Sequence, residues 1–131
     1  MKEEKVFRKA IKGLLKQGVQ STNLASTPNR IICEYRTVSG LKCAVGMLIK
    51  DDEYLKEMEY KSIWDLIESN LFPKRLAPHK DLLSQMQIIH DAYDKRSTPD
   101  AFNIFCARRY KELAKEYGFR TGFIDKLVKG S

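Results

Sequence analysis

The chain has 131 residues, of which 43% are apolar and 31% charged, and its formal net charge at pH 7 is +7. This length predicts one globular domain over residues 1–131, and the composition argues against an intrinsically disordered chain. No apolar run approaches 18 residues, so a membrane-spanning helix is not expected. Charged residues interrupt the apolar positions of the first fifteen residues, which argues against a secretory signal. Three cysteines without a CxxC pair are typical of a cytoplasmic protein rather than of a disulfide-bonded secreted one.

The positive charge is distributed unevenly along the chain. Residues 1–50 carry ten Lys or Arg against three Asp or Glu, and residues 71–131 carry twelve against seven. Between them, residues 51–70 carry two basic residues against seven acidic ones. A basic surface attracts anions, so the two basic segments indicate an anionic partner. The alternative interpretation is a solvated surface without any preference for a partner.

The first predicted helix covers residues 3–17. Its apolar residues recur at helical spacing and form one face, which consists of Val6, Phe7, Ala10, Ile11, Leu14 and Leu15. Lys9, Lys12 and Lys16 fall on other faces, and Gly18 is expected to end the helix as its C′ residue. The polar residues 21–29 that follow predict a loop.

A β-hairpin is predicted next, with strands over residues 30–36 and 41–45. The connecting residues 37–40 end in glycine, as in a type I turn with a G1 bulge. This register places Arg36 opposite Lys42, Tyr35 opposite Cys43 and Cys33 opposite Val45. Because side chains alternate along a strand, we expect an apolar face with Ile31, Cys33, Tyr35, Cys43 and Val45 and a charged face with Ile32, Glu34, Arg36, Lys42 and Ala44. An exposed hairpin edge is able to pair with a second copy, so the prediction is compatible with a homodimer.

Helical signals dominate the rest of the chain. Asp51 or Asp52 is expected to cap a helix that runs through residue 59, and Ser62 with Asp65 predicts a capping box for residues 62–69. A basic loop follows at residues 74–77. Further helices are predicted over residues 80–94 and from the start signal at residues 97–100 to residue 117, before Gly118. The predicted fold is therefore α+β, a mostly helical domain of about five helices with one β-hairpin near residues 30–46.

Several short motifs follow one another in a fixed order. They are LKQG at residues 15–18, CEYR at 33–36, GLKCAVGMLI at 40–49, DDEY and ME within 51–59, and QIIHD at 87–91. In this order they resemble the motifs of a family of small bacteriophage and prophage proteins with a C-x-Y-R…G-x-K-C-A-V-G signature. The chain departs from that pattern at Met47, where such proteins often have another cysteine. The resemblance implies a phage or prophage origin and action in the host cell cytoplasm; it brings no established activity and therefore no catalytic residues.

The cysteine motif also raises the question of catalysis or metal binding. Cys43 with His90 as base and Asp91 as its orienting partner is the pattern of a Cys-His hydrolase. However, Cys43 falls on the apolar face of the predicted hairpin, where a cysteine is usually an inert packing residue. A zinc site would need Cys33, Cys43, His79 and His90, whose spacing is longer than that of structural zinc sites. We therefore expect no enzymatic activity, no metal and no cofactor.

Residues 111–129 offer an alternative, a helix-turn-helix segment that binds DNA. Ala114 and Gly118 are four residues apart, and Ile124 and Leu127 fall where a second helix would pack onto the first. Against this, Gly122 weakens the recognition helix. The simpler interpretation is a helix with a glycine end followed by a short packing helix.

The candidate binding residues are the cations of the predicted hairpin and its surroundings. Arg36 and Lys42 face each other on the charged side of the hairpin, where like charges are relieved by a bound anion. Arg30, Lys74, Arg75, Arg108 and Arg109 extend this patch if the fold brings them together. The hypothesis is a phage-encoded, non-enzymatic accessory protein that binds a host protein, a nucleic acid or a nucleotide signal. By analogy with other small phage proteins, inhibition of a host defence is the role that this origin favours.

Overall fold

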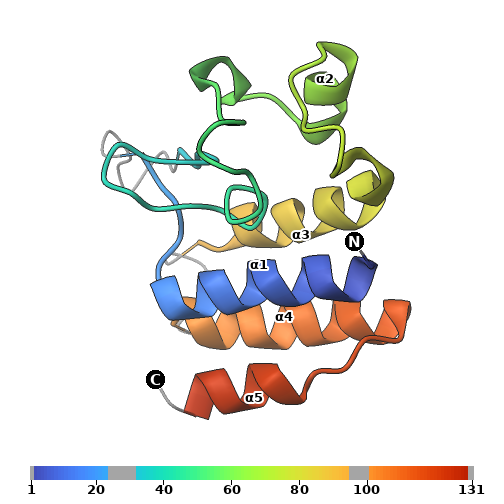
Figure 1. The fold of residues 1–131 in the computed structure, drawn as a ribbon. Helices are drawn as coiled ribbons and strands as arrows, with labels where there is room; N and C mark the ends of the chain where they lie inside the picture. Colours follow the sequence, from blue (N-terminus) through green and yellow to red (C-terminus); the bar gives the residue numbers. More distant parts are fainter. Residues whose placement is uncertain (1, 24–31, 95–100, 130–131) are drawn as a thin grey trace.

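Four helices form a bundle in one half of the molecule (Figure 1). They are α1 (Glu3–Gln17), α3 (Lys80–Ala92), α4 (Phe102–Tyr117) and α5 (Gly122–Lys129). The computed structural model describes residues 2–23, 32–94 and 101–129. α5 packs against both α1 and α4, and α3 packs against α1 and α4. The mostly helical prediction is therefore confirmed, and the described residues contain five α-helices in one small domain.

The remaining helix belongs to residues 32–79, which we call the loop-rich segment. This segment holds α2 (Ile63–Glu68) and two short 3₁₀ turns, η1 (Lys56–Met58) and η2 (Ala77–His79). It covers the side of the bundle on which α3 lies, and α2 packs against α3 (Figure 1). Two layers of different character result, one of long helices and one of short turns.

α1 forms as its sequence pattern predicts. Its six apolar positions are all buried, and Gly18 ends the helix in the left-handed region with φ +76°. The Gly18 N–H donates to the Leu14 carbonyl at 2.9 Å, which satisfies one of the last carbonyls of the helix. Periodic apolar residues and a glycine C-cap together determine both the buried face and the end of α1.

Aromatic side chains join the helices of the bundle. The Phe7 ring on α1 lies 6.4 Å from the Tyr110 ring on α4 and 6.3 Å from the Phe123 ring on α5, in edge-to-face geometry. The buried Tyr110 hydroxyl donates to the Met86 carbonyl of α3 at 2.8 Å. Edge-to-face pairs add to the burial of the rings themselves, so Phe7 and Tyr110 lie at the centre of the core.

Helix starts and ends elsewhere agree with the sequence to different degrees. The Ser62 hydroxyl accepts a hydrogen bond from the Asp65 N–H at 3.1 Å, which confirms the predicted cap of α2. Gly118 ends α4 with φ +73°, also as predicted. The helix predicted from Asp51 or Asp52 through residue 59 is wrong, because that stretch forms turns and only η1. The start signal at residues 97–100 lies outside the described residues.

The predicted β-hairpin is also wrong, since the described residues contain two isolated antiparallel bridges and no strand. One bridge joins Arg36 to Lys42, the pair that the predicted register placed opposite each other. The other joins Cys33 to Thr22 instead of Val45. Beyond Cys43 the chain coils into consecutive turns.

Two physical causes prevent the strands from extending. The carboxylate of Glu59 accepts the backbone N–H groups of Tyr35 at 2.7 Å and Arg36 at 3.1 Å, so these donors are taken by a side chain. The residues after Gly40 form a nearly continuous apolar run, and its members Cys43, Ala44, Val45, Leu48 and Ile49 are all buried. A strand with one solvent-facing side cannot bury consecutive residues, whereas helical turns can.

Gly46 allows this compact arrangement. A Cβ atom at this position would lie 2.0 Å from the Tyr35 carbonyl oxygen, which is far inside van der Waals contact. Only glycine permits the two backbones to approach this closely. The second glycine of the GLKCAVGMLI motif, Gly46, is thus explained by the close packing of this turn against the backbone of Tyr35.

Candidate functional site

Arg36, the first predicted anion-binding residue, holds part of the fold together. Its guanidinium donates to the Asp51 carboxylate at 2.7 Å and also to the Ile49 carbonyl. Its Cζ atom lies 5.1 Å from the centre of the Tyr54 ring, and only 15% of the side chain is exposed. The guanidinium is therefore committed to contacts within the protein.

Arg75 also binds the turn over residues 48–53. Its guanidinium forms two hydrogen bonds to the Glu53 carboxylate, at 2.7 and 3.0 Å, and donates to the Leu48 carbonyl. The hydrogen bond from Arg75 lowers the pKa of Glu53. Arg36 and Arg75 together fix the turn over residues 48–53, each through one carboxylate and one backbone carbonyl.

The other predicted cations lie on separate elements. Lys42 is half-buried, and its backbone exchanges two hydrogen bonds of 2.9 Å with the side-chain amide of Gln17 at the end of α1. Lys74 is exposed in the loop before η2, whereas Arg108 and Arg109 are exposed on α4. Arg30 lies outside the described residues. The predicted residues that the structure describes thus come from three segments of the fold, and Arg36 and Arg75 form ion pairs.

A different set of cations lies in a line along α1. Lys5, Lys9, Lys12 and Lys16 follow one another at intervals of four, three and four residues, which places them on one face of the helix. Lys5, Lys9 and Lys16 are exposed and Lys12 is half-exposed. Among the described residues, none of the four forms an ion pair with a carboxylate. We call these four residues the lysine stripe. Three were visible in the sequence as residues off the apolar face, and the lysine spacing itself was the signal for the stripe.

Residues 111–129, considered as an alternative helix-turn-helix segment, contain the end of α4 and the whole of α5. α4 ends at Gly118 and α5 begins at Gly122, and α5 runs back along α4 in the opposite direction (Figure 1). The helices of a DNA-binding helix-turn-helix cross at about 90–120°. Ile124 of α5 is fully buried, as expected for a packing helix. The arrangement is a helical hairpin whose second helix covers the core.

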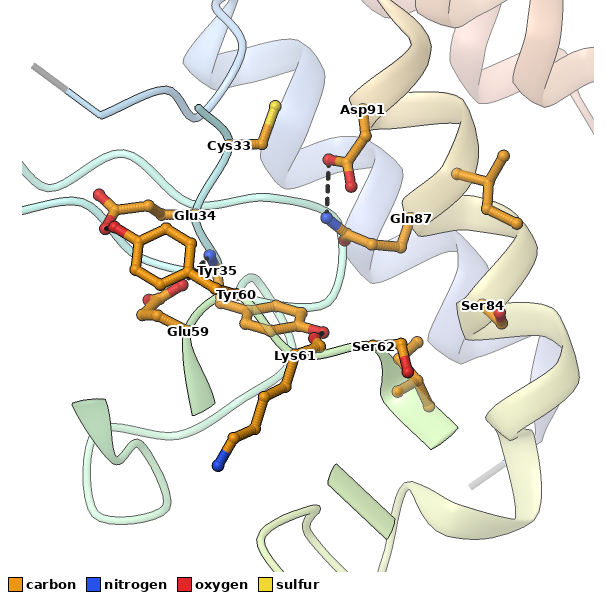
Figure 2. A pocket seen from close by; sticks show the side chains of 12 residues that line it. Cys33, Glu34, Tyr35, Glu59, Tyr60, Lys61, Ser62, Ser84, Gln87 and Asp91 are labelled. Carbon is orange, nitrogen blue, oxygen red and sulfur yellow. Dashed lines mark hydrogen bonds between the residues drawn. The ribbon is translucent and has the colours of Figure 1, made fainter. Parts of the chain in front are cut away.

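A cavity of about 300 Å³ lies between the loop-rich segment and α3 (Figure 2). Its walls are residues 33–35, residues 59–63 and the α3 residues Ser84, Gln87, Ile88 and Asp91. The lining residues that the structure describes include three carboxylates, Glu34, Glu59 and Asp91, but one ammonium group, that of Lys61. Two tyrosines, Tyr35 and Tyr60, belong to the walls. The sequence prediction did not include this cavity, because its walls are far apart in the sequence.

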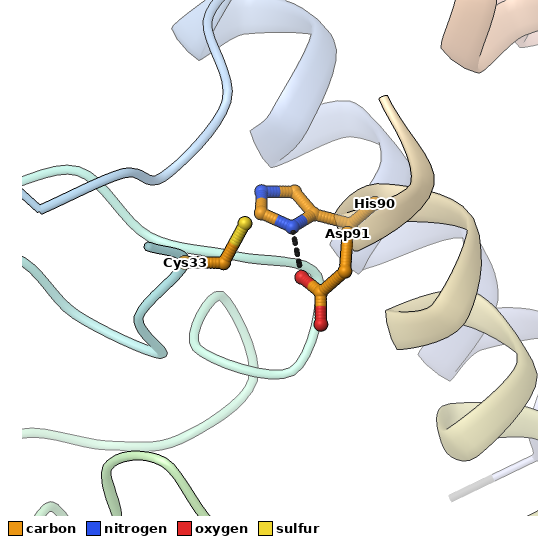
Figure 3. Close-up of side chains that lie close together, drawn as sticks. All are labelled: Cys33, His90 and Asp91. Atoms are coloured by element: carbon orange, nitrogen blue, oxygen red, sulfur yellow. Dashed lines mark hydrogen bonds and ion pairs between the residues drawn. The ribbon is translucent and has the colours of Figure 1, made fainter. Parts of the chain in front are cut away.

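At one end of this cavity lies a cluster of Cys33, His90 and Asp91 (Figure 3). The atoms of these side chains that could bind a metal lie within 4.8 Å of one another. The Ser21 N–H donates to His90 Nε2 at 3.0 Å, so this nitrogen carries no proton. The proton of the neutral ring is therefore on Nδ1, 2.8 Å from Asp91 Oδ1, to which it donates.

These hydrogen bonds decide what the cluster can do chemically. Both nitrogens of the buried His90 ring are hydrogen-bonded, and the lone pair of Nε2 is occupied by the Ser21 N–H. The ring therefore has no free lone pair for a metal or for the proton of a thiol. Burial, and then the charge of Asp91, raise the pKa of the Cys33 thiol to about 12. The thiol therefore stays protonated near neutral pH, the form that is a poor nucleophile.

The hydrolase interpretation had chosen the other cysteine. Cys43 is fully buried, and burial raises the pKa of its thiol well above the ordinary value. The structure brings Cys33, not Cys43, to His90 and Asp91. His79 lies apart from this cluster and contacts Glu3 of α1, with 3.2 Å between Nδ1 and the carboxylate. The four residues considered for zinc therefore do not form one site.

Comparisons with known proteins identify no relative of this chain. No family model matches the sequence, and no curated protein or solved structure is significantly similar to it. Among the described helices none has the length and apolar character needed to cross a bilayer.

Proposed function

We propose that this chain is a non-enzymatic accessory protein that binds an anionic partner along the exposed face of α1. The observation that supports the proposal is the lysine stripe, in which four cations lie in line without carboxylate partners among the described residues. The phage or prophage origin implied by the sequence motifs belongs to the same proposal. A role in the host cytoplasm follows from that origin.

The length of the stripe favours a polyanion over a single phosphate group. At a rise of about 1.5 Å per residue, Lys5 and Lys16 are about 16 Å apart along the helix axis. A nucleic acid backbone presents charges at short, regular intervals over this distance, so each lysine is able to meet a phosphate. Contacts between lysine ammonium groups and backbone phosphates carry no information about the base sequence. The expected binding is therefore independent of base sequence.

The fold gives the lysine stripe a rigid support. The opposite face of α1 is fully buried, and Gly18 and Gln17 fix the end of the helix against residue 42. On one flank, the Arg8 guanidinium lies 5.0 Å from the centre of the Phe123 ring of α5. A helix held in this way does not have to become ordered when it binds, so the ordering cost is small.

The test is a salt titration of binding to a random-sequence DNA duplex. Replacing all four lysines, as K5Q/K9Q/K12Q/K16Q, is expected to lower the magnitude of the slope of log K against log salt by about 3 to 4. The matched control, K50Q/K56Q/K61Q/K74Q, removes the same charge from the loop-rich segment. It is expected to keep the wild-type slope to within about one.

Two results would overturn the proposal. If both quadruple variants lose the same amount of binding, net charge and not the stripe attracts the duplex. If the wild-type protein binds no duplex in low salt, a nucleic acid is not the partner of this face.

A further inference from the structure

The cavity beside α3 has two carboxylates with unused capacity. Asp91 accepts from Gln87 at 3.0 Å and from His90 at 2.8 Å, both through Oδ1. Glu34 accepts from the Tyr60 hydroxyl at 2.6 Å, through Oε2. The Cys33 thiol also forms a hydrogen bond with the Asp91 carboxylate. Since each of the two oxygens of a carboxylate accepts up to two hydrogen bonds, Glu34 and Asp91 each retain room for a further donor.

Glu59, the third carboxylate in the wall, is not available to a ligand. Its Oε1 accepts from the Tyr35 N–H, and its Oε2 accepts from the Arg36 N–H and the Tyr54 hydroxyl. Its charge still contributes to the field in the cavity. Among the described lining residues the charge is negative, since Lys61 is the one cation beside the three carboxylates.

Tyr60 is held in the cavity wall in a strained conformation. Its φ of +64° lies in the left-handed region, which costs an aromatic residue free energy. The hydroxyl group donates to Glu34 and accepts from Asn23 Nδ2 at 3.2 Å, so both partners hold the ring in position. The Tyr35 hydroxyl, from the other tyrosine of the wall, donates to the Lys61 carbonyl at 2.6 Å (Figure 2).

We infer that this cavity binds an organic cation, a guanidinium or primary ammonium group carried on a short carbon stem. Glu34 and Asp91 accept hydrogen bonds from the cation, and the tyrosine rings contact the stem and attract the charge. A volume of about 300 Å³ holds a group of this size. The negative lining disfavours anions. A metal ion fits poorly, because both nitrogens of His90 and both oxygens of Glu59 are already hydrogen-bonded.

The first experiment is a titration of the full chain with agmatine, followed by NMR shifts of the amides of residues 33–35, 59–63 and 84–91. We expect saturable shifts with a Kd of about 1 mM or below. E34Q and D91N are each expected to weaken binding by about fivefold or more, because each removes one of the charges that face the ligand. E57Q, which removes a charge in η1 outside the cavity, is the matched control and should bind like the wild type.

The variant K61Q distinguishes a loss of the binding site from a loss of folding. Removing the like charge from the wall is expected to strengthen agmatine binding by about two- to threefold, a gain that an unfolded variant cannot produce. The inference is overturned if no cavity amide shifts at about 10 mM agmatine. It is equally overturned if E34Q, D91N and K61Q all bind like E57Q.

The cation has two possible sources, a free amine or an arginine or lysine side chain of a partner protein. The peptide Ac-Gly-Arg-Gly-NH₂ distinguishes them, because its backbone reaches the rim on which Ile88 and Tyr60 are exposed. Binding of the peptide at least about tenfold tighter than agmatine assigns the cavity to a side chain of a partner. Binding of equal strength assigns it to a free amine.

Discussion

The helical bundle and the loop-rich segment are stabilised in different ways. In the bundle, apolar faces of α1, α3, α4 and α5 meet in one core, and aromatic rings such as Phe7 and Tyr110 connect the helices. In the loop-rich segment, single polar side chains satisfy the backbone. Glu59 accepts two N–H groups, whereas Arg36 and Arg75 each donate to a carbonyl of the turn over residues 48–53. Stability is thus spread over many contacts in one region and concentrated in a few residues in the other.

The same difference decides which cations are available for binding. The arginines of the loop-rich segment that were predicted to bind anions are paired with carboxylates, as Arg36 with Asp51 and Arg75 with Glu53. The lysine stripe on α1 has no such partners among the described residues. An arginine that donates to backbone carbonyls in a turn outside any helix or strand is needed to stabilise that turn. A lysine on the outer face of a regular helix is not needed there and stays available to a partner. Binding variants should therefore be made on α1 first.

The largest expected effect is in the bundle. Phe7→Ala removes a fully buried ring that contacts α4 and α5, so we expect it to lower the free energy of unfolding by about 3–5 kcal/mol. Urea unfolding followed by circular dichroism measures this value. Lys9→Ala on the exposed face of the same helix should change it by less than about 0.5 kcal/mol. A small effect of Phe7→Ala would mean that the bundle is not the main source of stability.

A smaller but localised effect is expected in the loop-rich segment. Glu59→Ala leaves the backbone N–H groups of Tyr35 and Arg36 without their acceptor, at an expected cost of about 2–3 kcal/mol. Native-state hydrogen exchange should show faster exchange at these two amides than anywhere in α1. Glu57→Ala, two residues away and exposed, is the control and should leave both amides unchanged. Equal exchange in the two variants would contradict the role given to Glu59.

The smallest expected effect is a pH dependence from the Arg75–Glu53 pair. Because the folded state lowers the pKa of Glu53, this carboxylate stabilises the fold above the ordinary glutamate pKa. That contribution is lost as the pH falls through the lower pKa of the folded state. Glu53→Gln should therefore be less stable than the wild type at neutral pH, by up to about 1 kcal/mol, and the difference should shrink in acid. Thermal unfolding at several pH values measures it, and a difference that grows in acid would contradict the assignment.

How far the sequence predicts the structure depends on the region. Local signals predict α1 of the bundle with its end at Gly18, and they also predict the cap of α2 at Ser62 in the loop-rich segment. In the loop-rich segment, the pairing of Arg36 with Lys42 was predicted correctly, but the strands around it do not form. The reason is non-local, since the carboxylate that replaces the ladder, Glu59, is more than twenty residues away in the sequence. The spacing of residues along the chain does not indicate that the Glu59 carboxylate, and not a second strand, accepts the backbone N–H groups of Tyr35 and Arg36.

The candidate site shows the same limit. The sequence analysis weighed Cys43 as the partner of His90 and Asp91 and favoured a packing role for it, whereas the structure brings Cys33 to these two residues. The predicted strand alternation put Cys43 and Cys33 on the same face. In the structure Cys33 pairs with Thr22 instead, and the chain forms turns after Cys43. The cavity walls come from three distant segments, so no motif could indicate them.

What the sequence determined by itself is α1 with its buried face and its excess of lysine, the cap of α2 at Ser62 and the end of α4 at Gly118, because these depend on residues within a few turns of one another. The tertiary structure decided which cations are paired, which cysteine lies beside His90, and where a negatively lined cavity forms. Those outcomes depend on carboxylates and backbone groups that meet only after the chain has folded. Local periodicity records the burial of apolar faces, whereas hydrogen bonds between distant polar groups leave no periodic trace in the sequence.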